Sequence, residues 1–483
     1  MLGQSRFVRR FCALALPRMA PALLASALAG CAAFSPDAGM GGVNSVVAPQ
    51  LGTAALKVGT QEAAAQAVSR TRALLRSPLS AEAAVRVALL NNKGLQASYN
   101  ELGIAEAVMV EASLPPSPTI SLSRISTPVE LDIERRIVAD ILALATWPAR
   151  TEIAAQRFRQ AQLRAAEETL RLAAATRRRY YRSVAAVEIV AALGRAAGAA
   201  ETAAKLAREL GATGAMNKLD QARENAFHAD VVTQLDVARQ DAATARERLV
   251  RAMGLSDDNL GFKLPQSLPA VPKRPRALVA VETNAIRRRI DLQIARLEAE
   301  AVAKSYGLTN ATRFINLLEV AGVSRTQRDA SGAQGTGGGG ELDFQIPIFD
   351  FGEARLREAR ETYMQAINRL REKAVNVRSE AREAYQVYRY RYDIAEHFRR
   401  DVLPLRKTIS DETMLRYGAM QIDVFALLSE ARQRIAANIA AIEAQRDYWL
   451  ADTDLDAAIA GGGVDSADGV PAAAGSTPSG TNE

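Results

Sequence analysis

The stretch ELDFQIPIFDFG, residues 341–352, decides the fold. Apolar side chains at 342, 344, 346 and 348 alternate with acidic, amide or proline residues. This two-residue period predicts a β-strand with one apolar face. The last three residues lead into a segment that predicts one long helix, ending near Arg416. Pro404 is expected to kink this helix or to mark an insertion.

The expected helix is too long for an ordinary globular domain. At 1.5 Å per residue, a helix of about 61 residues spans ~90 Å and needs packing partners along its whole length. From Leu356 to Val402, fourteen positions follow one another in steps of four and three residues, and twelve of them are apolar. This stripe predicts a packing seam of the coiled-coil type.

The same order of elements occurs twice, which indicates a duplication. The expected elements of the first half are a helix over 81–113, strands over 119–123 and near 137–145, and helices over 150–210 and 216–253. Those of the second half are a helix over 277–305, a strand near 312–323, a flexible glycine-rich loop over 331–340, the opening strand, its long helix, and a helix over 421–456. The turn Gly214-Ala215-Met216 recurs as Gly418-Ala419-Met420.

The N-terminus is typical of a lipoprotein signal. Arginines precede an apolar stretch that ends in Leu28-Ala29-Gly30-Cys31, like the bacterial lipobox, so we expect a signal peptide over 1–30 and a lipid on Cys31. We expect a lipid-anchored, extended tether over 31–78, repeats over 79–254 and 277–457, a proline-rich linker over 255–276, and a disordered tail over 458–483. No stretch after the signal is apolar enough for a membrane-spanning helix.

Composition excludes several classes of function. The 483 residues carry a formal charge of +7, which falls to +3 once the four arginines of the signal are removed, so no nucleic-acid partner is expected. His228 and His397 are single and distant, and only two cysteines occur, so no metal site or cofactor is expected. No nucleotide loop, nucleophile elbow or other catalytic motif is present, and we expect no enzyme.

Four expected strands cannot close a membrane barrel, since the smallest have about eight. An open sheet in lipid would leave its edges without hydrogen-bond partners. Two chains would give eight strands and three would give twelve, and a water-filled passage needs the larger number. A membrane-crossing form of this chain is therefore expected to be an oligomer.

Four motifs in order resemble the TolC-like outer-membrane factors, in their lipoprotein branch. They are the lipobox at Cys31, LSAEAA (79–84) followed by NN (91–92), LPPSPTISL (114–122) and IPIFDFG (346–352). The resemblance implies a mainly α fold with a small β part. Long coiled-coil helices would form a periplasmic α-barrel, and each protomer of a homotrimer would add four strands to a transmembrane β-barrel in the outer membrane. The loops 125–135 and 325–340 would face outside the cell.

The resemblance also implies partner proteins, and it implies that the two helix turns form the periplasmic tip of the channel. The two helix turns would dock a periplasmic adaptor coupled to an inner-membrane pump, or form the gate. The residues concerned are Gly214, Met216, Asp220, Tyr417, Gly418, Met420 and Asp423. Relatives often have glycine at the position of Met420, so the sequence departs from the family pattern at the tip, where the adaptor would make contact.

Four of the predicted tip residues have two possible roles, one functional and one structural. Asp220 and Asp423 would form a cation-selective ring in three copies, or they are acids favoured by the dipole at helix N-termini. Met216 and Met420 would bind a soft metal ion, or they pack as apolar side chains. The simpler reading is preferred in both cases.

The function expected is passive conduction through the outer membrane, as the exit channel of an efflux or export system. The alternative is a periplasmic coiled-coil lipoprotein with a structural or adaptor role.

Overall fold

The computed structural model describes residues 34–461 except 129, 257–260, 278–279 and 330. The expected signal peptide, the lipid on Cys31 and the end of the C-terminal tail lie outside the described residues. The chain divides into two compact units. The strand unit comprises Met1–Gly59, Lys93–Glu168 and Ile290–Asn376, and the turn unit comprises Thr60–Asn92, Thr169–Arg289 and Val377–Glu483.

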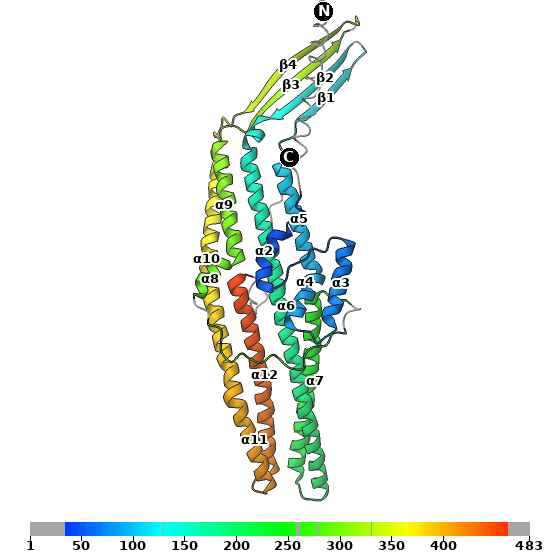
Figure 1. Ribbon diagram of the computed structural model, residues 1–483, viewed down its shortest axis with the longest axis vertical. Coiled ribbons are helices and arrows are strands. Elements are labelled where there is room, and N and C mark those ends of the chain that lie inside the picture. The colour runs from blue at the N-terminus through cyan, green and yellow to red at the C-terminus, as the bar shows by residue number, and fades with distance from the viewer. Residues whose placement is uncertain (1–33, 129, 257–260, 278–279, 330, 462–483) are drawn as a thin grey trace, which may run out of the picture. The chain divides into compact units, whose positions relative to one another are not determined.

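The strand unit carries a four-stranded antiparallel sheet in the order β1-β2-β3-β4 (Figure 1). Its strands are β1 (Thr119–Ser126), β2 (Leu131–Asp140), β3 (Leu317–Arg328) and β4 (Gln334–Gln345). Each half of the chain supplies one hairpin, and the central β2–β3 pair joins the halves. The outer edges of β1 and β4 have no partner strand within the described chain.

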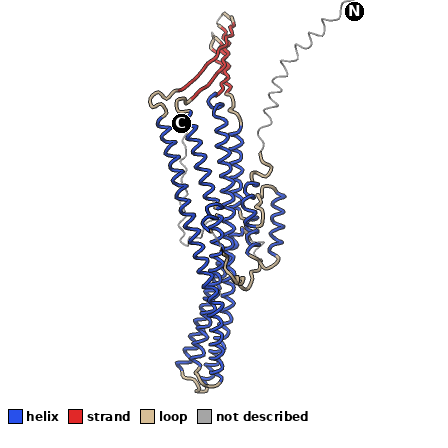
Figure 2. Tube along the Cα trace, turned by 60° about the vertical axis from the view of Figure 1, so that its left-hand side comes forward, coloured by secondary structure: helices blue, strands red, loops and turns tan. Residues whose placement is uncertain are grey.

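Helices make up the rest of both units (Figure 2). The strand unit contains α2 (Met40–Leu51), α5 (Lys93–Ser113) and α9 (Ile290–Ala311). The turn unit contains α3 (Gln61–Leu75), α4 (Ala81–Asn91), α7 (Lys218–Met253), α8 (Val281–Arg288), the π-helical η2 (Phe398–Val402), α11 (Leu403–Gly418) and α12 (Val424–Ala460). Two helices contribute to both units, α6 (Ile141–Ala212) and α10 (Glu353–His397).

The two halves of the chain contain the same order of elements. Each half begins with a helix expected to be continuous, over 81–113 and 277–305, and both expectations are wrong. The first breaks at Asn92 (φ −66°, ψ 112°) and the second at Arg289 (φ −66°, ψ 120°), where one extended residue interrupts the helix. Neither break has a proline or glycine at the interrupting residue, so the usual breaker signals were missing.

The N-terminal segment is not an extended tether. Residues 40–51 and 61–75 form α2 and α3. Val43 and Val47, one helical turn apart, are fully buried, and the Thr60 hydroxyl accepts a hydrogen bond from the Ala63 amide as the cap of α3. In the strand unit, the side chain of Glu106 on α5 accepts the Ser35 amide at 2.7 Å, which fastens the segment before α2.

The glycine-rich segment 331–340 is not a flexible loop. Residues from Gln334 to Gly340 belong to β4 and pair with β3 in continuous register. The strand then ends at Gln345, so Ile346 and Ile348 lie beyond it. Glycine carries no side chain to show alternation, and the strand is held by backbone pairing with β3 instead.

The remaining boundaries shift by a few residues. The second strand ends at Asp140 rather than near Ala145, and Pro148 lies inside α6 rather than at its start. The third strand begins at Leu317 instead of Thr312. The expected irregularity near Pro404 is confirmed, because the π-helical η2 directly precedes α11, where this proline lies in the first turn.

One helix contains a longer apolar stretch than the sequence led us to expect. Among the described helices, α6 contains a stretch of 18 residues that is long and apolar enough to cross a membrane, and 33% of that stretch is buried. This corrects the expectation that no later stretch is apolar enough. A buried core helix passes the same test, so composition alone does not assign α6 to a membrane.

Candidate functional site

The sheet register places most of the large apolar side chains on one face and all the carboxylates on the other. Residues paired across antiparallel strands point to the same face. Ile120 pairs with Ile137, and Val320 pairs with Leu342, so these four share one face. We call it the apolar face; its large hydrophobic members are Leu122, Leu131, Ile133, Leu318 and Phe344, with the four just named.

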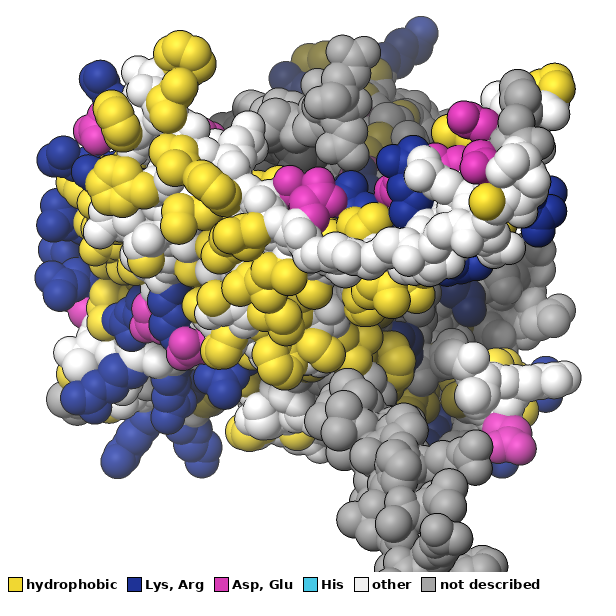
Figure 3. All heavy atoms as spheres, turned by 90° about the horizontal axis from the view of Figure 1, so that it is seen from above, with side chains coloured by type: hydrophobic (Ala, Val, Ile, Leu, Met, Phe, Trp, Pro, Cys, Tyr) yellow, Lys and Arg dark blue, Asp and Glu magenta, His cyan; other side chains and the backbone are white. Residues whose placement is uncertain are grey.

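The apolar face is open in the chain. Ile120 is 74% exposed, Leu122 73% and Phe344 61%. Viewed from the strand end, hydrophobic side chains gather over a broad part of the visible face (Figure 3). A sheet of a water-soluble protein covers such a face with other elements. An uncovered apolar sheet face is instead what a lipid-facing barrel wall presents.

The opposite face, which we call the charged face, carries all the acids of the four strands. They are Asp132, Glu134, Asp140, Glu319, Glu341 and Asp343. Arg136 on β2 reaches across β3 and contacts Glu341 at 3.1 Å and Asp343 at 2.9 Å. Arg325 binds the Asp132 carboxylate through two nitrogen atoms. These contacts are partly exposed, as expected of a wetted surface rather than a buried core.

The first predicted turn lies between α6 and α7. Gly214 adopts φ +77° and closes the turn. The Asn217 side chain accepts the Asp220 amide at 2.9 Å, and its amide donates to the Asp220 carboxylate at 2.7 Å. Asp220 is also 3.3 Å from Arg223 in the first turn of α7. The carboxylate of Asp220 is thus engaged locally, at a helix N-terminus.

The second predicted turn lies between α11 and α12. The Asp423 carboxylate accepts the Ala426 amide at 2.8 Å and caps α12. Tyr417 and Gly418 end α11, and the Tyr417 carbonyl accepts the Met420 amide at 3.0 Å. Met420 is 94% exposed and adopts φ +57°, the left-handed region where glycine is favoured.

The sequence prediction missed the contact that joins the two turns. Arg223 of α7 places its guanidinium 4.7 Å from the ring centre of Phe425 in the first turn of α12. Further along the same helices, Arg432 lies 4.5 Å from the ring centre of Phe227. No short motif marks such pairs, because each joins residues about 200 positions apart. Among the described residues, no group of three or more His, Cys, Asp or Glu side chains is arranged to hold a metal ion.

Replacing Met420 with glycine is expected to stabilise the protein by roughly 0.5–1 kcal/mol. The change relieves the left-handed backbone and removes almost no packing, because the side chain is exposed. Thermal unfolding of the purified protein measures the gain. Met216→Gly is the matched control, since Met216 lacks positive φ, and it should give no gain. A lower unfolding temperature for Met420→Gly would show that the side chain makes a stabilising contact.

Asp423 variants separate its capping role from a charge in the pore. Asparagine caps helices about as well as aspartate, whereas alanine costs about 1 kcal/mol. We therefore expect Asp423→Asn to keep the stability that Asp423→Ala loses, with cation selectivity in planar bilayers unchanged in both. A selectivity change shared by the two variants would favour the charged ring.

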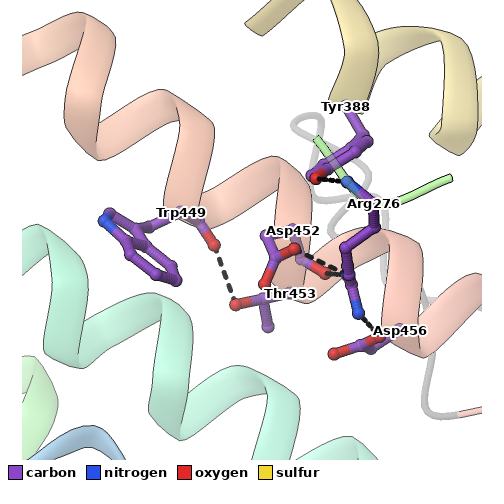
Figure 4. Close-up of polar contacts among 6 residues, drawn as sticks. All are labelled: Arg276, Tyr388, Trp449, Asp452, Thr453 and Asp456. Carbon is purple, nitrogen blue, oxygen red and sulfur yellow. Dashed lines mark hydrogen bonds and ion pairs between the residues drawn. The ribbon is translucent and has the colours of Figure 1, made fainter. Parts of the chain in front are cut away.

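A second missed cluster holds the linker between the halves. Arg276 contacts Asp452 at 2.6 Å and Asp456 at 2.9 Å, one turn apart on α12 (Figure 4). Its backbone amide donates to the Tyr388 hydroxyl of α10 at 2.9 Å. Trp449 of α12 donates its indole N–H to the Pro269 carbonyl at 2.8 Å. These contacts hold the proline-rich linker against α12, the last helix of the second half.

The environment of Asp452 in this cluster predicts that the folding stability depends on pH. Burial raises the pKa of the Asp452 carboxyl from its ordinary value of 3.8 to about 6, against the attraction of Arg276. The folded state therefore holds this proton more tightly than the unfolded state. The stability contribution is fully present below pH 3.8 and is lost as the pH rises through about 6.

We expect Asp452→Asn, which cannot titrate, to flatten the decline in stability over this window. Unfolding temperatures measured from about pH 4 to pH 7 give the slope. Asp456→Asn is the control, because it removes a partner of Arg276 but leaves the titrating group. An unchanged slope in Asp452→Asn would contradict the assignment.

Solved outer-membrane channels share this fold. OprN has a TM-score of 0.68 and 17% identity over 90% of this chain and 97% of its own. CusC, whose structures concern folding and transmembrane channel formation, has a TM-score of 0.67 and 16% identity over 79% and 92%. The open state of the MtrE outer membrane channel of Neisseria gonorrhoeae has a TM-score of 0.61 and 19% identity over 78% and 88%.

No family model matches the chain, and no curated protein is similar to it in sequence. The sequence identities to the solved channels are below one fifth, so the likeness establishes the fold alone. The long helices and the four-stranded antiparallel sheet match that architecture. The chain has the fold of TolC-like outer-membrane channels.

Proposed function

We propose that the chain forms a passive channel through the outer membrane, as the exit duct of a tripartite efflux or export system. The observation that carries the proposal is the sheet, with an exposed apolar face and a charged face on its other side. This arrangement suits a wall with lipid on one side and water on the other. The shared fold with solved outer-membrane channels supports it.

The open edges of β1 and β4 support a homotrimer. Each unpaired backbone group costs several kcal/mol in lipid, so the edges must find partners. Joining β1 of one protomer to β4 of the next satisfies them, and three protomers with four strands each give a closed barrel of twelve. The charged faces would then line the water-filled interior.

In the proposed channel, different parts of the chain would lie in different compartments. Cys31 would carry the lipid that anchors the protein to the outer membrane. The hairpin turns would face the outside, and the turns before α7 and α12 would form the periplasmic tip. The tip exposes Leu219, Leu415 and Met420 to solvent, an apolar surface suited to docking a periplasmic adaptor.

Conduction needs no chemistry by the protein. The inner-membrane pump would supply energy, and the channel would open when the adaptor separates the helix ends at the tip. The Arg223–Phe425 contact joins the two turns within one protomer, so they would move as one body. The gate would therefore lie between protomers.

Planar-bilayer recording on the purified protein tests the proposal. A channel gives stepwise conductance increments, and its oligomer migrates as a higher-mass band on gels until the sample is heated. A soluble, elongated monomer without conductance, after removal of the lipid, would support a periplasmic structural or adaptor lipoprotein instead.

A further inference from the structure

Three arginines interrupt the apolar face in the half of the sheet that leads to the hairpin turns. Arg124 pairs with Ile133, Arg135 with Leu122, and Arg328 with Leu131. The register therefore turns all three toward the same side as the exposed apolar side chains. They lie on three successive strands, and all are exposed. Arg124 and Arg135 are diagonal neighbours, for which Cα atoms are about 7–8 Å apart.

These arginines differ from those of the charged face. Arg136 and Arg325 each contact carboxylates there. The apolar face has no acid in any of its four strands, and no described carboxylate pairs with Arg124, Arg135 or Arg328. Among the described residues, the Thr326 hydroxyl is the hydrogen-bond partner of Arg135, at 3.3 Å. The guanidinium groups are thus available to an anion from outside the chain.

The position of the three arginines along the strands indicates what kind of anion they would meet. An arginine on a lipid-facing barrel surface costs about 2–4 kcal/mol at the bilayer midplane and nearly nothing at the interface. The row of Ile120 and Ile137 is level with Gly322, at the middle of β3, and Val320 lies closer to the helical end of the sheet. Arg124 and Arg328 lie toward the turns, and Arg135 is two residues from Ile137 in the direction of the same turns. Guanidinium binds phosphate through two parallel hydrogen bonds.

We infer that Arg124, Arg135 and Arg328 form a binding site for the phosphate groups of a phosphorylated lipid in the outer leaflet. This inference rests on the proposed function, which places the apolar face in the membrane and the hairpin turns outside. The site would set the depth of the barrel and bind a ring of anionic lipid around it. Repetition in each protomer would place three such sites around the channel.

Lipid retention tests the site. The detergent-purified assembly is mixed with bisphosphorylated lipid A, monophosphorylated lipid A or phosphatidylcholine, and bound lipid is counted by native mass spectrometry. Each arginine near a membrane surface contributes about 1 kcal/mol toward anionic lipid. Changing all three to glutamine should therefore weaken retention of bisphosphorylated lipid A by about a hundredfold.

Two controls make the outcome specific. Arg325→Gln removes the same charge from β3 on the charged face and should retain the lipid as wild type does. Inorganic phosphate at matched concentration should not displace the lipid, since the apolar face binds its acyl chains. Equal retention by the triple variant and wild type, or displacement by free phosphate, overturns the inference.

The conductance recording keeps this test separate from the proposed function. A protein that conducts and shows no preference for phosphorylated lipid contradicts the lipid site alone. A protein that neither inserts nor conducts contradicts the proposed function, and the lipid site with it.

Discussion

Replacing Ile120 with arginine is expected to abolish insertion of the channel into membranes. Ile120 lies in the apolar band of β1, opposite Ile137, and is 74% exposed in the chain. A charge there costs about 2–4 kcal/mol at the bilayer midplane, so three protomers together lose about 6–12 kcal/mol. The side chain packs against little within the chain, so the isolated fold should persist.

Ser123→Arg is the matched control. Ser123 lies on the same strand but on the charged face, opposite Glu134, where a new arginine gains a partner. Both variants add one positive charge to β1. Membrane fractionation and planar-bilayer conductance should show wild-type behaviour for Ser123→Arg and loss for Ile120→Arg. Equal insertion of the two would mean that the apolar face does not meet lipid.

Replacing Gly352 with alanine is expected to destabilise the strand unit by about 2–5 kcal/mol. Gly352 adopts φ +73°, and a Cβ atom there would lie 2.2 Å from the Arg313 carbonyl oxygen. The left-handed backbone costs roughly 1–2 kcal/mol, and the overpacking costs roughly 1–3 kcal/mol. The backbone cannot yield easily, because the Asp350 carboxylate accepts the Gly352 amide at 3.0 Å.

That hydrogen bond, with one from the Ala354 amide, lowers the pKa of the Asp350 carboxyl, so the junction favours its charged form at neutral pH. Denaturant unfolding and the yield of folded oligomer measure the loss in Gly352→Ala. Gly335→Ala is the control, because a Cβ at this position of β4 meets nothing within 4 Å. A Gly352→Ala protein as stable as the control would contradict the close approach of the two backbones.

Side-chain periodicity predicted the strands that have alternating side chains and the long helices that have apolar stripes. The alternation at residues 342–345 and 119–123 lies in real strands, and the long helices occur where apolar stripes placed them. On α10, the stripe residues Val377, Ala381 and Tyr388 are buried within the turn unit. The recurring turn predicted the duplication, which the matching breaks at Asn92 and Arg289 support.

The errors have physical causes. The glycines of β4 carry no side-chain pattern, so their strand is specified by its partner β3. The helices α2 and α3 are short, and their packing against other helices outweighs a glycine- and alanine-rich composition. Arg276 lies in a linker, and its carboxylate partners follow about 180 residues later, beyond the reach of any local motif.

The face assignment also required the structure. Strand alternation alone separates two sets of residues in each strand, but only the register shows which sets share a face across four strands. The predicted tip residues occupy two turns, and the contact that joins them, between Arg223 and Phe425, was not among them. Their roles in docking or gating remain predictions.

Electron cryomicroscopy of the protein in lipid nanodiscs would resolve what pairs with the free edges of β1 and β4. We predict three chains around a closed barrel of twelve strands, with β1 of each protomer hydrogen-bonded to β4 of the next, the apolar face toward lipid and the charged face toward water. A single chain with both edges unpaired, or a sheet lying outside the bilayer, would contradict the account.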